Sequence, residues 1–303
     1  MQATLATSVT LTGIGLHSGR PVRMTLCPAP VGHGIVFRRR DAGDVRLPAL
    51  WSDVRQEPLN TRLGLGEVTV ATIEHLMAAL AGTGLVNVRV DLDGPEVPAL
   101  DGSSAEFVRA ILRAGIAPQD APREAIVVRR PVVVRQGEAV ARLDPAEGMV
   151  IDFTIDFAEA AIGRQHRRLD MANGAFLRML CDSRTFCRKS DVDAMQAAGL
   201  GLGGSLSNAV VVEGDRVLTP GGLRHADEAV RHKMLDALGD LATAGAPLFA
   251  RYTGLRAGHA LTNALLRALF ADPANYERIV CDDARARRLP GVALGPGDLA
   301  AVA

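Results

Sequence analysis

Four titratable side chains share one stripe of a segment that is otherwise small and apolar. Residues 230–241 read VRHKMLDALGDL, which predicts a helix. With His232 at zero, Asp236 lies at about 40°, Asp240 at about 80° and Lys233 at about 100° around the helix axis. A solvent-facing helix usually has a broad polar face and a narrower apolar one. Here the polar face is the narrow one and the apolar face is broad. This predicts that the polar residues either line a pocket or form ion pairs along a slightly exposed edge of the helix.

His232 and Asp236 have the spacing of a pair of metal ligands. Residues four apart project from the same side of a helix, and imidazole nitrogen and carboxylate oxygen are both good zinc ligands. A second acid–histidine unit, Glu74-His75, lies among small and apolar residues in TIEHLMAAL. Three protein ligands plus water are typical of a catalytic zinc, and Glu74 could act as the general base toward that water. The alternatives are a surface hydrogen bond between His232 and Asp236 and a buried, hydrogen-bonded His75.

Two further residues could take part in proton transfer and charge stabilisation. His259 begins an apolar segment after Gly258, where it could donate a proton to a leaving group or only cap a helix. Asp240 is the candidate to keep that imidazole protonated. Lys233 is one of only two lysines among 34 basic residues. Because lysine is a compact point charge and arginine a planar fork, we expect a small ammonium to be needed there.

Two other classes of protein are alternatives to a catalytic metal site. The loop GLGLGGS (199–205) fits G-x-G-x-x-G, as in a nucleotide-dependent oxidoreductase, but that fingerprint follows a strand and opens a helix. Here the loop follows a predicted helix and leads into the strand NAVVV. A non-catalytic protein with a structural metal site would usually close it with four ligands, often cysteines. The four cysteines contain no CxxC pair.

The composition is that of a globular protein with a core. The chain has 303 residues, 48% hydrophobic and 22% charged, and 34 basic residues balance 34 acidic ones. The zero net charge does not favour nucleic acid or an anionic membrane as a partner. No apolar run is long enough to span a bilayer, and the first residues do not read as a signal peptide. We expect a protein of the reducing cytoplasm without stable membrane insertion.

The elements that must position these residues occur in two halves of similar plan. In each half strands come first and helices follow, which predicts an α+β fold in which helices pack on a sheet. We expect domains at 1–120 and 126–303, and IAPQDAPREA (116–125) is the linker candidate. The patterns predict helices over 72–84, 105–115, 172–181, 191–198, 226–243 and 258–270.

Six motifs together resemble one enzyme family. They are TIEHLMAAL, PALDGSSAEFV, SRTF, GLGGSLSNAVVV, RHKMLDALGDL and GHALTNALLRAL, in this order along the chain. This set is similar to the UDP-3-O-acyl-N-acetylglucosamine deacetylases, zinc amidases that commit the cell to lipid A synthesis. The resemblance implies two similar domains, each a β-sheet packed against α-helices in a two-layer sandwich, with the active site between them. It also implies hydrolysis of the N-acetyl group to acetate and the free amine.

The resemblance implies a role for each candidate residue. His75, His232 and Asp236 would be the ligands of one Zn²⁺, with Fe²⁺ as the alternative native metal, and Glu74 the general base. His259 would assist departure of the glucosamine nitrogen, positioned by Asp240. Thr185 and Lys233 would stabilise the oxyanion beside the metal, as such sites require.

The family's second domain also carries an insert that encloses the fatty acyl chain. The matching stretch is about 187–212, where the resemblance implies that Val192, Met195, Leu200 and Val211 line an apolar passage. Lys233, His17, Asp191 and Arg256 would contact the nucleotide end of the small-molecule substrate, bound by a monomer. After SRTF the chain has Cys187-Arg188-Lys189, where the family pattern is more apolar and includes an aromatic residue. This departure concerns the shape of the passage and the preferred acyl length.

Overall fold

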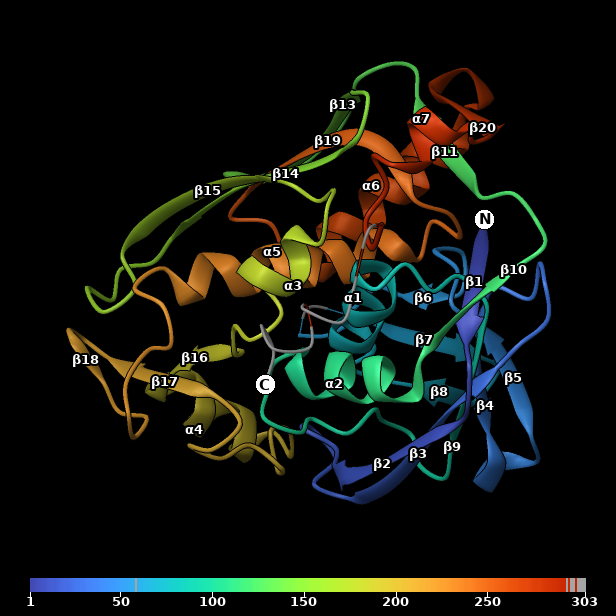
Figure 1. Cartoon of the computed structure of the whole chain (residues 1–303). Coiled ribbons are helices and arrows are strands. Elements are labelled where there is room, and N and C mark those ends of the chain that lie inside the picture. The colour runs from blue at the N-terminus through green and yellow to red at the C-terminus, as the bar shows by residue number, and fades with distance from the viewer. Residues whose placement is uncertain (58, 293, 295–297, 299–303) are drawn as a thin grey trace.

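Two β-sheets enclose a double layer of helices in the computed structural model, which describes residues 1–57, 59–292, 294 and 298 (Figure 1). The N-terminal sheet, at the bottom of the view, has the order β2 (Val9–Ile14), β3 (Pro21–Pro28), β9 (Val88–Leu92), β4 (Ile35–Arg39) and β5 (Val45–Pro48). β4 is parallel to β9, and the other pairs are antiparallel. Alternate residues of β3, among them Met24 and Leu26, are buried beneath the helices, as expected of a sheet with one face on the core.

The C-terminal sheet lies at the top of the same view and has seven strands. Its main path runs through β12 (Val132–Gln136), β13 (Ala139–Pro145), β19 (Leu248–Leu255), β11 (Glu124–Val128) and β20 (Tyr276–Val280). β14 (Met149–Asp156) pairs with β19 and carries β15 (Arg164–Asp170) at the edge. Every second residue of β14 is buried, which gives the sheet one apolar face toward the helices.

The two helical layers meet at α1 (Glu74–Gly82) and α5 (Glu228–Ala242). α1 lies with α2 (Ala105–Ala114) over the N-terminal sheet, and α5 lies with α6 (His259–Ala271) against the C-terminal sheet (Figure 1). At Gly239 a Cβ atom would stand 2.0 Å from the carbonyl oxygen of Glu74. The glycine therefore allows the two backbones to approach closely, at the residues that the sequence picks out for chemistry.

Smaller elements complete the chain. A β-ribbon joins β1 (Gln2–Leu5) to β10 (Ile116–Gln119), and a three-stranded sheet contains β6 (Val54–Arg55), β7 (Arg62–Leu65) and β8 (Val68–Val70). Another contains β16 (Phe186–Arg188), β17 (Val210–Glu213) and β18 (Arg216–Val217), beside α4 (Lys189–Ala197). The remaining helices are α3 (Ala175–Met179), α7 (Asp283–Ala286) and the 3-10 turns Arg40–Ala42 and Pro273–Asn275.

The α+β class expected from the sequence is confirmed. The helix expected over 172–181 is shorter, because Asn173 and Gly174 have positive φ values of 55° and 71° and α3 begins only after them. The linker expected over 116–125 is wrong for most of its length. Residues 116–119 pair with β1 and Glu124 begins β11, so only 120–123 connect the two parts.

The division into domains at 1–120 and 126–303 stays a prediction. The change of sheet between β10 and β11 favours it, while one buried apolar cluster continues from the N-terminal sheet through α1 and α5 into the C-terminal sheet. Residues 293, 295–297 and 299–303 of the second range lie outside the described residues. Among the helices that the structure describes, none is long and apolar enough to cross a membrane.

Candidate metal centre and active-site cavity

Three buried side chains converge where α1 meets α5. His75 lies in the first turn of α1, and His232 and Asp236 lie one turn apart on α5. Asp236 Oδ1 is 3.5 Å from His75 Nε2 and 3.3 Å from His232 Nε2, and one ligand atom from each residue lies within 4.8 Å of the other two. Burial leaves little water to solvate these groups, so their arrangement must be stabilised by one another or by a bound ion.

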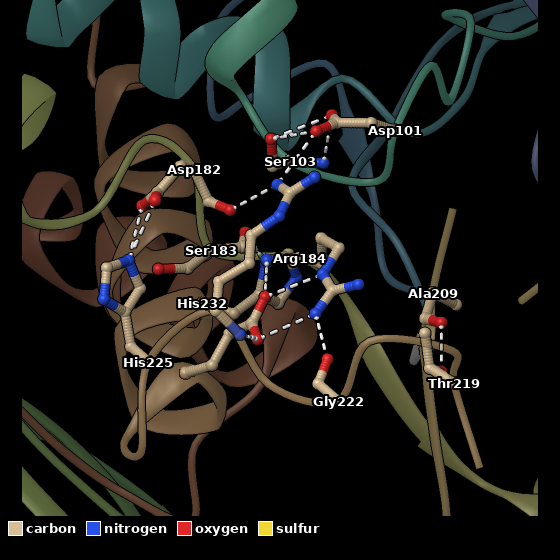
Figure 2. Close-up of polar contacts among 12 residues, drawn as sticks. Asp101, Ser103, Asp182, Ser183, Arg184, Ala209, Thr219, Gly222, His225 and His232 are labelled. Atoms are coloured by element: carbon tan, nitrogen blue, oxygen red, sulfur yellow. Dashed lines mark hydrogen bonds and ion pairs between the residues drawn. The ribbon is translucent and has the colours of Figure 1, made fainter. Parts of the chain in front are cut away.

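The donor set fits a divalent metal ion. Asp236 Oδ1 is buried without a hydrogen-bond partner among the described residues. His232 Nδ1 lies 3.0 Å from the carbonyl oxygen of Ser183 (Figure 2), and because a carbonyl only accepts, Nδ1 carries the proton and Nε2 offers a lone pair. Burial lowers the pKa of His232 to about 4, which keeps the imidazole neutral at physiological pH. Two imidazole nitrogens and one carboxylate oxygen could therefore hold an ion with a coordination position left open.

Glu74 and His259 face each other beside these three residues. Glu74 Oε1 is 3.9 Å from His259 Nε2, and the same nitrogen is 3.8 Å from Asp236 Oδ2. Burial raises the pKa of Glu74 above its ordinary value. Burial alone would lower the pKa of His259, but the Asp240 and Glu74 carboxylates raise it to about 9. The Glu74 carboxylate and the cationic His259 imidazole therefore lie next to each other beside Asp236.

Asp240 and Thr61 hold this pair in place. Both Asp240 carboxylate oxygens lie 3.0 Å from His259 Nδ1. The Thr61 hydroxyl donates to Asp240 Oδ1 at 2.5 Å, and its main-chain N–H donates to Glu74 Oε2 at 3.0 Å. Thr61 could not be predicted from the sequence, because it comes just before β7 in a loop without any recognisable motif. Its position can be seen only when the loop is folded against α1 and α5.

Lys233 and Thr185 also reach the site. Lys233 Nζ donates to Asp236 Oδ2 at 2.7 Å. Burial opposes the charge, but Asp236 raises the pKa of Lys233 above its ordinary value, so the side chain stays an ammonium. Thr185 is held through its main chain, since its N–H donates to the carbonyl of Gly102 at 2.8 Å and its own carbonyl accepts from Val210 at 2.8 Å.

The site opens into a cavity of about 760 Å³. Its wall contains most of the residues that the sequence analysis selected: His17, Thr185, Asp191, Val192, Met195, Val211, His232, Lys233, Asp236, Arg256 and His259. Glu74, His75 and Asp240 are buried behind this wall. Leu200 is not part of the wall, and its N–H instead closes the turn after α4 by donating to the Met195 carbonyl.

Two of the polar residues expected at the nucleotide end, Asp191 and Arg256, have side-chain partners in the protein. Asp191 accepts both of its hydrogen bonds from Arg188, each at 2.7 Å. Arg256 donates to Asp156 at 2.7 Å and also pairs with Glu138. His17 is buried, and its main-chain N–H donates to Glu96 at 2.9 Å. A ligand would therefore compete with these pairs for Asp191 and Arg256, whereas Glu96 fixes the backbone at His17.

Comparison with known proteins identifies the family of the chain. The family model described as UDP-3-O-acyl N-acetylglycosamine deacetylase matches residues 2–271. The chain belongs to this family. A relative named UDP-3-O-acyl-N-acetylglucosamine deacetylase, from Anaeromyxobacter sp. (strain Fw109-5), is 48% identical over 297 residues, 97% of each chain. A relative of the same name from Myxococcus xanthus (strain DK1622) is 47% identical over 300 residues, 99% of this chain and 95% of its own.

Proposed function

We propose that the protein is a zinc-dependent hydrolase that removes the N-acetyl group of UDP-3-O-acyl-N-acetylglucosamine, with water as co-substrate and acetate as second product. Membership of the deacetylase family supports the reaction. The observation that carries the proposal is the meeting of His75, His232 and Asp236 with Glu74 and His259 beside one cavity, whose wall contains His232, Asp236 and His259. We propose that this reaction is the committed step of lipid A synthesis, as the resemblance of the sequence motifs implies. We also propose that the enzyme is cytoplasmic.

The proposed metal ligands are His75, His232 and Asp236. A divalent ion held there would polarise the amide carbonyl and lower the pKa of a water molecule. We propose Zn²⁺ because two histidines and one carboxylate form a usual catalytic zinc set, with Fe²⁺ as the alternative. The orphaned Asp236 Oδ1 and the fixed Nδ1–H of His232 support this assignment.

Glu74 and His259 are proposed as the base and the acid. Thr61 occupies Glu74 Oε2, so Oε1 is the oxygen that can take a proton from water as it attacks the acetyl carbon. As the C–N bond breaks, protonated His259 gives its Nε2 proton to the leaving nitrogen, and acetate and a free amine result. Asp240 keeps His259 protonated, which is the role expected of a carboxylate beside a general acid.

Lys233 and Thr185 are proposed to stabilise the negative charge that develops on the acetyl oxygen. Donors fixed in a water-poor site stabilise such a charge more than water can. Lys233 keeps its charge through Asp236, and Thr185 is placed at the cavity by Gly102 and Val210. All candidate site residues come from one chain, so a monomer can carry out the proposed reaction.

The wall formed by α4 and β17 is proposed as the acyl-binding part of the cavity. Val192, Met195 and Val211 give it apolar surface, while His17, Asp191 and Arg256 are proposed contacts for the nucleotide. Leu200 is proposed to support this wall from the turn after α4. The glycine loop 199–204 lies between α4 and β17, in the order opposite to a dinucleotide fingerprint, so we do not propose an oxidoreductase.

Metal analysis combined with acetate release from UDP-3-O-acyl-N-acetylglucosamine tests this function. We expect about one metal ion per chain, loss of acetate release on chelation, and recovery on adding Zn²⁺. Parallel recovery with Fe²⁺ under anaerobic conditions compares the two metals. Full acetate release from metal-free protein would contradict the proposal.

A further inference from the structure

Glu228 is a buried carboxylate surrounded by hydrogen-bond donors, one turn before His232 on α5. It is 1% exposed. Glu228 Oε1 accepts from the main-chain N–H and the Nε of Arg184, both at 2.9 Å. Glu228 Oε2 accepts from Arg184 Nη2 at 3.1 Å and from the main-chain N–H of Arg224 at 2.7 Å. Burial opposes its ionisation, but the Arg184 side chain and these N–H groups hold the pKa of Glu228 below its ordinary value.

The same peptide group that donates to Glu228 accepts from His232. The N–H of Arg184 and the carbonyl of Ser183 belong to one planar peptide unit, whose two polar groups point in opposite directions. Its N–H donates to Glu228. Its carbonyl accepts Nδ1–H of His232 at 3.0 Å (Figure 2). One peptide plane is thus held at both ends by two residues of α5 that are four positions apart.

The Ser183 side chain contributes nothing to this attachment. Its hydroxyl is buried without a hydrogen-bond partner. The turn is instead held through the Arg184 guanidinium, which also donates to the carbonyl of Gly222 at 2.8 Å. The Ser183 carbonyl therefore depends on Arg184 and Glu228 for its direction.

We propose that Arg184 and Glu228 are positioning residues for the metal ligand His232. Their ion pair fixes the Ser183 carbonyl, the carbonyl sets the tautomer and ring orientation of His232, and Nε2 is left directed at the metal. Groups that hold the second nitrogen of a ligating histidine commonly change metal affinity or activity by about 10- to 100-fold when removed. This inference rests on the proposed function in one respect, which is that His232 is a metal ligand.

The network also ties this turn to the N-terminal half. Arg224 Nη1 donates to Asp101 Oδ2 at 2.9 Å and to the carbonyl of Asp182 at 2.6 Å. Thr185, at the end of the same turn, is held by the Gly102 carbonyl. The turn that carries the Ser183 carbonyl is therefore also fixed to the N-terminal half, through the Arg224 side chain and the main chain of Thr185.

Nitrogen-15 NMR of the histidines in metal-free protein, followed by Zn²⁺ titration, tests the proposal. The wild-type spectrum should show His232 as the Nδ1–H tautomer. In Arg184→Lys, which keeps the charge but loses the fork, and in Glu228→Gln, we expect a mixture of tautomers and Zn²⁺ binding about 10- to 100-fold weaker. The matched control is Arg38→Lys, which alters a comparable arginine–carboxylate pair with Asp91 (2.6 and 2.8 Å) on the N-terminal sheet.

A wild-type tautomer with Zn²⁺ affinity within twofold of the Arg38→Lys control, in both variants, would overturn the proposal. Glu228→Asp keeps the charge and shortens the reach, and it decides the question if the other two variants do not fold. If wild-type protein shows the Nδ1–H tautomer and the variants lose it, but no form binds Zn²⁺, the positioning holds and the proposed metal function fails.

Discussion

Helices α4 and α5 line the same cavity but are held in opposite ways. α5 is buried along most of its length between α1 and the C-terminal sheet, whereas no residue of α4 is fully buried. Several charged groups of α5 pair with other elements, as in Asp240 with His259 and Glu228 with Arg184, while Lys233 and Asp236 pair within the helix. Those of α4 pair locally, as in Lys189 with Asp193. The chemical end of the cavity is therefore built into the core, and the proposed acyl-binding end is attached to the surface.

This difference gives a physical reading of Cys187-Arg188-Lys189, which departs from the apolar pattern that the resemblance implies. Arg188 pairs with Asp191, and Lys189 pairs with Asp193 one turn along α4. Exposed pairs of this kind contribute about 0–1 kcal/mol each. The departure changes the part of the cavity wall that contains residues 187–189 and leaves the proposed metal ligands on α5 untouched.

The largest effect is expected at the buried end, from Glu74→Gln. The amide keeps the shape of the side chain but cannot take a proton, so turnover should fall by about 10²- to 10⁴-fold, the usual contribution of a general base. Acetate release and metal content are measured on the same sample. A variant that loses its metal as well as its activity would show that Glu74 is a ligand rather than a base.

Gly239→Ala should have the next largest effect, because its Cβ would stand 2.0 Å from the Glu74 carbonyl oxygen. Overpacking costs roughly 1–3 kcal/mol, and the gain in helix propensity returns about 1 kcal/mol. We expect the free energy of unfolding to fall by up to about 2 kcal/mol and metal binding to weaken, as measured by denaturant unfolding and Zn²⁺ titration.

The control is Gly199→Ala, in the loop after α4, where φ is 73° and no other atom lies within 4 Å of the added Cβ. Backbone strain there costs about 1–2 kcal/mol. Its Zn²⁺ affinity should be unchanged. If both variants lost the same amount of Zn²⁺ affinity, the conclusion that the proposed metal site depends on the packing of α5 and not on α4 would be wrong.

A smaller effect is expected at the proposed acyl wall, from Met195→Ala. Met195 is half-buried, so its loss should cost about 1 kcal/mol of apolar contact with the acyl chain. We expect KM to rise about fivefold with kcat unchanged. The same sugar nucleotide with a short acyl chain is the control substrate. An equal rise in KM for the short chain would place the acyl group elsewhere.

The smallest effect is expected from Asp193→Asn, which breaks the exposed pair with Lys189. An i,i+4 pair on a helix surface is worth about 0.3–0.5 kcal/mol, and salt screens it. The melting temperature and KM should both stay within experimental error of wild type. A clear fall in the melting temperature or a clear rise in KM would mean that α4 depends on this pair and is more rigid than its exposure indicates.

Much of the site could be predicted from residue order, because helices repeat every 3.6 residues. That period alone brings His232 next to Asp236 and places Lys233 and Asp240 on the same stripe. The pairing of β10 with β1 could not be predicted from the Pro- and Ala-rich sequence of 116–125. Register in a short ribbon depends on its partner strand, not on a hydrophobic period.

The sequence by itself determined which chemical groups the protein carries and which share a helix face, because these follow from local geometry. Only the tertiary structure decided that α1 meets α5 at Gly239, that Thr61 joins Glu74 to Asp240, and that one peptide plane joins Glu228 to His232. These contacts join segments far apart along the chain. Buried polar groups need hydrogen-bond partners because water does not reach them. Which partners they find depends on how the core packs, and a local sequence pattern does not show this.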